Sequence, residues 1–379
     1  MIHFADDFID LAALGVCGDM MSALEAENQY LWKEGFSHVK NTFFKTLCEK
    51  QDYSMKGRVN PTSVAFYIVP LINAMVRVGT MEEKSRMFDA FKDGNQLIPS
   101  HKRGAYGTYD TVANESAREC TNAKRHQDDT KKEIASILDH KIEERKLLDN
   151  KILFLRLEDS LQFPSELTGL IAMQISARYK RPTIIARLNE DGHLRGSMRG
   201  LSNCEISSFK DFLQKSGLFT YVLGHDNAAG IDIANENLKA FHEYANNALK
   251  DIVFSDNYYY PSFVRNCSEK DLSDIIFDLS KYEDIWGQNN EIPRILVKNI
   301  EITSNEIQVL GRNQDTVKFH KWGIDYIKFT CKDLVPKLKK HNSMILTVYG
   351  KPMINEYMGR TTPQIQIEDI NIEDPLIAF

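Results

Sequence analysis

The spacing of apolar residues changes along the chain, and the first changes predict two different elements. Residues 8–21 form an apolar run interrupted by small residues and carrying Gly18-Asp19 near its end. A short run of this kind predicts a buried strand that delivers a carboxylate at its end, where open α/β sheets place ligands. From 22 to 91 the apolar positions recur at helical spacing, which predicts a helical segment.

A polar segment then separates two patterned regions. Residues 111–150 are strongly polar and contain neither Pro nor Gly. This composition predicts one long exposed helix linking two bodies, although a solvated surface helix of a single domain fits it as well. The following segments, 151–157, 169–179 and 182–188, read as strand, helix and strand. A unit of this length predicts a parallel pair of strands.

The last part of the chain predicts a β-barrel. From about Pro293, short alternating segments recur at 295–297, 307–310, 326–329, 344–348 and 365–367. Five short strands with turn residues between them suit a small barrel, of which the OB-fold is one kind. The expected fold class is therefore α/β plus β-barrel.

Composition narrows the class of protein. A chain of 379 residues with 42% hydrophobic and 26% charged residues predicts a soluble protein of two or three domains. No apolar run approaches the roughly 18–20 residues that cross a bilayer, and the acidic start is no signal peptide. Six scattered cysteines without a CxxC pair argue against zinc and disulfides and suit a reducing cytoplasm. With a net charge of −6, nucleic acid would need a local basic groove.

Three places carry candidate chemistry. Asp19 could bind Mg²⁺ or Mn²⁺ through oxygen, or it could cap a helix. In the segment 196–200, Ser197 and Arg199 could hold a phosphate between glycines, unless the segment is a plain turn. In the glycine-bounded loop 224–230, His225 could bond a phosphate or a base, unless it is structural. The sequence has no HxxxH, Walker or GxSxG motif, so a self-sufficient two-metal site is not expected.

Taken together and in this order, these segments resemble the RecJ family of the DHH phosphoesterase superfamily. Residues 10–19 resemble the family's fourth motif, whose final Asp is a metal ligand, and 65–79 resemble the helical motif that follows it. Residues 169–172, 195–200 and 224–230 resemble the DHH-associated domain. Residues 286–293 are similar to the join before the family's OB-fold, and 354–357 and 367–370 resemble its close.

The resemblance implies a function and a division of the chain. It implies a 5′–3′ exonuclease for single-stranded DNA that uses Mn²⁺ or Mg²⁺, with Asp19 as a metal ligand. The implied DNA or phosphate contacts are Ser197, Arg199, Gly224, His225 and Arg77. The expected domains are the remainder of a DHH α/β domain (1–105), a connecting helix (106–150), the DHH-associated domain (151–265), and a helical join with the OB-fold (266–379).

The OB-fold is expected to hold the trailing strand by stacking and backbone contacts. Trp322, Tyr326, Lys328 and Phe329 are the candidate groove residues. Core packing explains the aromatic residues equally well.

The departures from the family matter as much. A DxD, a further Asp and the Asp-His-His all precede the fourth motif in the family and are missing here. Leu71 stands where the family has Arg, and Pro164 where it has His. We therefore expect activity only with a separate DHH-domain chain as partner, in the cytoplasm and with no membrane. The alternative is a non-catalytic single-strand-binding or scaffold protein. A phosphodiesterase for short oligonucleotides is disfavoured by the barrel, and the compact organisation suggests a phage or mobile element.

Overall fold

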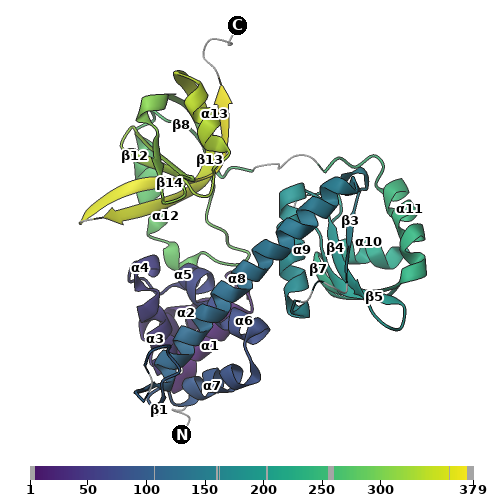
Figure 1. Cartoon of the computed structure of the whole chain (residues 1–379). Helices are drawn as coiled ribbons and strands as arrows, with labels where there is room; N and C mark the ends of the chain where they lie inside the picture. Colours follow the sequence, from purple (N-terminus) through teal and green to yellow (C-terminus); the bar gives the residue numbers. More distant parts are fainter. Residues whose placement is uncertain are drawn as a thin grey trace. The chain divides into compact units, whose positions relative to one another are not determined.

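The computed structural model describes residues 5–105, 107–158, 161, 163–201, 204–254, 260–357 and 359–373 (Figure 1). The chain divides into two compact units by its contacts. The first unit combines Met1–Lys40 and Asp52–Tyr67 with Tyr259–Phe379. The second combines Asn41–Gln51 with Ile68–Tyr258.

The first unit begins with helices, and the expected strand at its start is wrong. Its helices are α1 (Ile9–Gly18), α2 (Ala26–Ser37), α4 (Asp52–Met55) and α5 (Pro61–Ser63). In α1 the buried residues are Asp10, Ala13, Leu14 and Cys17, which recur at the 3.6-residue period of a helix. A short apolar run rich in Leu and Ala favours a helix once a partner covers one face, and periodicity alone did not separate the two states.

The second part of this unit is the OB-fold. It contains β8 (Phe263–Asn266), α12 (Asp271–Ser280), β9 (Ile295–Thr303), β10 (Gln308–Leu310), β11 (Thr316–Lys321), β12 (Ile324–Lys328), α13 (Leu334–Lys340), β13 (Ser343–Tyr357) and β14 (Arg360–Glu373). The strands form one sheet in the order β10-β11-β12-β14-β13-β9-β8, with a register shift in β13 at Tyr349/Gly350. Five strands were expected within this sheet, and β8 and β11 are additional.

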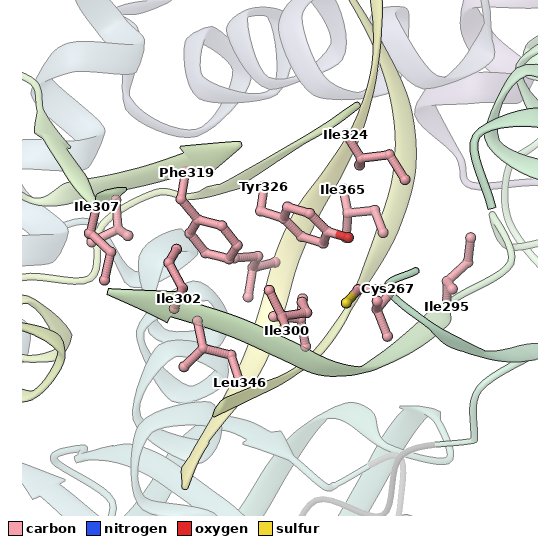
Figure 2. Packing of buried hydrophobic residues seen from close by; sticks show 14 of the residues in the cluster. Cys267, Ile295, Ile300, Ile302, Ile307, Phe319, Ile324, Tyr326, Leu346 and Ile365 are labelled. Carbon is pink, nitrogen blue, oxygen red and sulfur yellow. The ribbon is translucent and has the colours of Figure 1, made fainter. Parts of the chain in front are cut away.

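The core of the OB-fold is aliphatic around one aromatic pair. Phe319 and Tyr326 stack with ring centroids 4.9 Å apart (Figure 2). Ile300 and Leu346 belong to the same buried cluster, which α12 joins through Leu272. Phe319 on β11 pairs directly with Tyr326 on β12, so their buried stack holds the two strands together.

The helices of the second unit are α3 (Thr42–Lys50), α6 (Val69–Val78), α7 (Met81–Lys92) and α8 (Val112–Glu144). The single long helix predicted for residues 111–150 is confirmed by α8. It is not wholly exposed, however, because Ala117, Cys120 and Leu138 are among its buried residues. The small side chains in its first half let α6 and α7 pack closely against it. The polar composition of the segment concealed this row of small buried residues.

One helical run differs from expectation in its hydropathy. Pro61–Val78, which includes the π-helical turn η2 (Val64–Ile68), is 18 residues long with a mean hydropathy of 1.3. Its length and composition would suffice to cross a membrane, and 39% of it is buried. The buried side chains Val64, Ile68, Leu71 and Met75 recur at helical spacing, which is the pattern of a helix facing a protein core.

The sheet of the second unit carries the candidate site. Its strands are β3 (Leu153–Leu157), β4 (Thr183–Leu188), β5 (His193–Arg199), β6 (Phe219–His225) and β7 (Ala228–Ala234), in the order β3-β4-β5-β7-β6. The expected parallel pair is confirmed by β3 and β4. Helices α8 and α9 (Thr168–Tyr179) cover one face, and α10 (Phe209–Lys215) and α11 (Leu238–Ala248) cover the other (Figure 1).

Candidate nucleic-acid interface

Arg199 lies at the start of α9, within the electrostatic reach of a second arginine, Arg77. The guanidinium of Arg199 lies against the first turn, because a Cβ added to Gly169 would stand 2.5 Å from its Nη2. Arg77, near the end of α6, is close enough that its charge affects Arg199, and Val78 beside it packs on the core shared by α8 and α9. Burial lowers the pKa of Arg199, and the charge of Arg77 lowers the pKa further. Burial also lowers the pKa of Arg77.

Hydroxyl groups complete this arrangement. The Ser197 hydroxyl on β5 lies 2.9 Å from the Thr168 hydroxyl at the first residue of α9. The amino end of a helix carries a partial positive charge, so cations beside it are unfavourable and anions are favoured. Among the described residues no carboxylate pairs with Arg77 or Arg199. The Thr168 hydroxyl donates to the Ser165 carbonyl oxygen over 2.7 Å, so the Ser197 hydroxyl donates to Thr168. The site therefore gathers positive potential that an anion would satisfy.

A row of side chains leads away from this site across the sheet. Ala228 pairs with Arg199 on one side and with His225 on the other, so all three lie on the face that carries α9. Gly224, at φ +140°, precedes His225, and a Cβ there would stand 2.7 Å from the Ala228 carbonyl oxygen. Glycine is required at this position, where β6 pairs with β7.

The row borders a hollow of about 610 Å³. Arg199, His225 and Lys180 bring nitrogen groups to its wall, and Asn227 adds an amide. The apolar part of the wall includes Met173 and Phe254. Glu205 and Asp251 also line it, so its wall carries both signs of charge. A hollow of this size with a few polar groups is typical of a small-ligand site.

Two glycine motifs have different local structures from those expected. Gly196 to Arg199 lie in strand β5 rather than in a turn. A Cβ at Gly196 would stand 1.9 Å from the Ile185 carbonyl oxygen, so this glycine permits close strand packing rather than an anion cradle. Residues 224–230 are the end of β6, a two-residue turn and the start of β7. Paired strands satisfied the backbone at both places, which isolated glycines did not reveal.

Asp19 does not form a metal centre with the residues described here. It follows α1 as its C-cap, with its backbone N–H 2.9 Å from the Gly15 carbonyl oxygen. Its side chain is exposed. In the described ranges it belongs to no group of three possible ligands. One carboxylate does not hold Mg²⁺ or Mn²⁺ in a protein cage, so the chain's described residues do not fit a two-metal site by themselves.

The structure also sorts the other candidates. Leu71 is buried, so this side chain packs in the core and offers no group to a ligand. In the OB-fold, Tyr326 is fully buried, whereas Trp322 is 62% and Phe329 is 52% exposed. The Lys328 amino group donates to the Glu368 carbonyl oxygen over 2.7 Å. Core packing therefore explains Tyr326, and the two exposed aromatic residues stay groove candidates.

Some residues of the site were not expected from the sequence. Thr168 and Asn227 sit beside the motifs, and the only signal was their position next to Gly169 and His225. Lys180 adopts φ +52° after α9. Nothing in its local sequence indicates that it faces the hollow.

Comparisons with known proteins identify the architecture. The RecJ OB domain family matches residues 266–369. YorK, the SPbeta prophage-derived protein of Bacillus subtilis (strain 168) named a single-strand DNA-specific exonuclease, is 34% identical over 375 residues. That match covers 97% of this chain and 65% of YorK. The single-stranded-DNA-specific exonuclease RecJ of the same strain is 21% identical, with 97% of this chain and 44% of RecJ covered.

A solved structure agrees with these relatives. RecJ of Thermus thermophilus in complex with Mn²⁺ superposes with a TM-score of 0.69 at 18% identity, covering 97% of this chain and 50% of that chain. The chain thus spans about half to two-thirds of the length of the proteins it matches. It is a homologue of YorK and RecJ, and it has the α/β and OB-domain architecture of the RecJ type.

Proposed function

We propose that this chain grips the 5′ end of single-stranded DNA as part of a RecJ-like 5′–3′ exonuclease. One observation carries the proposal. The guanidinium of Arg199 lies at the amino end of α9, where two hydroxyls also lie, and Arg77 is near enough for its charge to act on Arg199; no described carboxylate neutralises either arginine. A terminal phosphate has the charge and the acceptor oxygens that such a site satisfies.

The neighbouring face offers a path for the first nucleotides. Leu223 is 68% exposed, and Tyr221, two residues before it on β6, is 38% exposed. With His225 they form a partly apolar surface beside the cations. Bases that leave the phosphate site would stack on such side chains, and Trp322 and Phe329 would serve the trailing strand in the OB-fold.

Hydrolysis requires groups beyond those described. In the proposal, Asp19 supplies one oxygen ligand for Mn²⁺ or Mg²⁺, which would activate water for attack on the phosphodiester. The remaining ligands come from an amino-terminal DHH part supplied as a separate chain. The names of YorK and RecJ support the exonuclease part of the proposal, and the Mn²⁺ and Mg²⁺ complexes of Thermus RecJ support the metal.

A second candidate is a single-strand-binding or scaffold protein without catalysis. The isolation of Asp19 from other possible ligands in the described ranges favours it. It shares the phosphate site with the first candidate. The two differ only in turnover.

One experiment tests both candidates. A 3′-labelled single strand carrying a 5′ phosphate or a 5′ hydroxyl is mixed with the chain, with and without a DHH part from a RecJ-like relative, in Mn²⁺. Arg199→Ala should weaken binding of the phosphorylated strand by about 10- to 150-fold, the worth of a charged hydrogen bond of about 1.5–3 kcal/mol. Arg178→Ala is the matched control, because this α9 arginine pairs with Asp139 away from the site.

The outcomes separate the candidates. Degradation only in the mixture supports the exonuclease. Binding without degradation in either tube supports the scaffold. Equal affinity of the chain for 5′-phosphate and 5′-hydroxyl strands would refute the phosphate site.

A further inference from the structure

A β-hairpin between α7 and α8 presents cations that are not part of the proposed phosphate site. Strands β1 (Leu97–Pro99) and β2 (Tyr109–Thr111) pair in antiparallel register, with Pro99 opposite Tyr109. The tip carries His101, Lys102 and Arg103, all exposed. In the described parts of the chain, Lys102 and Arg103 have no carboxylate partner.

The hairpin is fastened to α8 through buried carboxylates. The Ser100 hydroxyl donates to Glu115 over 2.6 Å, and Arg118 pairs with the same carboxylate. Glu115 is 1% exposed. On the next turn, Glu119 accepts from Arg86 Nε at 3.1 Å and lies 3.7 Å from His101 Nδ1. A tip tied down in this way loses little further entropy when it binds a ligand.

These carboxylates do not constitute a metal site. The possible ligand atoms of His101, Glu115 and Glu119 lie within 4.8 Å of one another, a grouping that the sequence did not suggest. Arg118 and Arg86 already neutralise the two carboxylates. The cluster therefore acts as the hairpin's anchor.

The tip also displays an aromatic surface. Tyr109 is 67% exposed at the end of β2 nearest the tip, opposite Pro99, and Leu97 is 66% exposed at the far end of β1. The backbone closes beneath the tip where the Ser100 N–H donates to the Thr108 carbonyl over 2.9 Å. Two cations without a partner among the described carboxylates, on the same hairpin as an exposed tyrosine, combine the two contacts that single-stranded nucleic acids use, namely phosphate charge and base stacking.

We propose that this hairpin is a second binding site for single-stranded nucleic acid. Lys102 and Arg103 contact the phosphodiester backbone and Tyr109 stacks on a base. In a chain with a net charge of −6, a local pair of unneutralised cations is the kind of feature through which a polyanion binds. The inference rests on the proposed function, because it adds a contact to the same ligand.

The test measures binding of a fluorescent 20-nucleotide oligo-dT by the full chain across a series of salt concentrations. Two lost phosphate contacts in Lys102→Ala/Arg103→Ala should lower the slope of log affinity against log salt by about 1.4. If the variant and the unmodified chain have equal affinity at 1 M salt, this change of slope lowers the affinity of the variant by about 25-fold at 0.1 M. Lys102→Arg/Arg103→Lys keeps the charge and should retain the slope. Lys239→Ala/Lys250→Ala makes the same charge change on exposed residues elsewhere in this unit and should retain the affinity.

Tyr109 supplies an independent readout. Tyr109→Ala should weaken binding by at least about fivefold without changing the salt slope, and Tyr109→Phe should retain the affinity. If both hairpin variants bind like the unmodified chain, the inference is wrong. A duplex that binds as well as the single strand and is equally sensitive to Tyr109→Ala would also overturn it.

The design separates this inference from the proposed function. If Arg199→Ala weakens binding and the hairpin variants do not, only the hairpin inference fails. If the hairpin variants weaken binding and Arg199→Ala does not, the hairpin stands and the phosphate site fails. If the unmodified chain binds no single strand, both fail.

Discussion

Gly169→Ala separates the phosphate site from the stability of the fold. A Cβ at this position would stand 2.5 Å from Arg199 Nη2 and 3.2 Å from its Cζ. Ordinary contacts between such atoms are about 3.5 Å, so the guanidinium must shift by about 1 Å. The shift moves it away from the first turn of α9, while the backbone stays in place because only a flexible side chain has to yield.

The magnitude follows from the hydrogen bonds that the shift breaks. A charged hydrogen bond contributes about 1.5–3 kcal/mol, so the affinity for a 5′-phosphorylated strand should fall by about 10- to 150-fold. Affinity for a 5′-hydroxyl strand should change much less. Thermal stability should hold or rise, because Ala is favoured over Gly in helices by up to about 1 kcal/mol.

Fluorescence anisotropy with the two strands and a thermal melt measure both effects. Gly15→Ala in α1 is the matched control, because a Cβ there has no atom within 4 Å. Retention of the full preference for the 5′-phosphorylated strand by Gly169→Ala would refute the reasoning. Equal losses for both strands would point to a general disturbance of the fold.

Three further predictions rest on buried groups. Gly196→Ala forces a Cβ to within 1.9 Å of the Ile185 carbonyl oxygen. It should lower the free energy of unfolding by about 1–3 kcal/mol, as measured by urea titration. An unchanged urea midpoint would contradict the close packing of β4 on β5. Burial alone would raise the pKa of Glu115, but Ser100 and Arg118 outweigh it and lower the pKa, so its stabilisation is present above about pH 4.3 and is lost below that value. Glu115→Gln should therefore destabilise the chain by about 1–3 kcal/mol at pH 7 and flatten its loss of stability between about pH 5 and 3, as denaturation at several pH values would reveal. Burial raises the pKa of Cys17 and Cys120 to about 12, whereas Cys204 lines the hollow. Iodoacetamide at about pH 8 should therefore modify Cys204 before Cys17 and Cys120. Peptide mass spectrometry measures the order of modification, and the reverse order would contradict this prediction.

The sequence was sufficient where one physical signal dominated. A polar stretch without Pro or Gly predicted α8, and β-rich segments of regular length predicted the parallel strands and the OB-fold. Arg199 and Ser197 were predicted as phosphate contacts because their residue types suit phosphate, and the structure places both beside the start of α9. The proximity of Arg77 to Arg199 was not predictable from spacing alone, because it depends on how α6 and α9 each pack on α8.

The failures had physical causes as well. The run containing Asp19 was short enough to be helix or strand, and packing against α2 decided for a helix. A Cβ at Gly35 of α2 would stand 2.7 Å from the Ala13 Cβ, a closeness that no propensity scale encodes. The hairpin after α7 went unnoticed because its strands are only three residues each and buried carboxylates of α8 hold it in place.

The length of α8 has a consequence for dissecting the protein. Ile134, Leu138 and Ile142 near its end belong to the core of the β3–β4 sheet, while Ala117 and Cys120 near its start are buried in the helical part of the same unit. A fragment cut at residue 151 would leave the sheet without these side chains, each worth about 1.5–3 kcal/mol when buried. Because α8 contributes buried side chains to both cores, a cut between them should destabilise both. Both should melt in a single transition, and a protease that nicks α8 should release neither part in folded form.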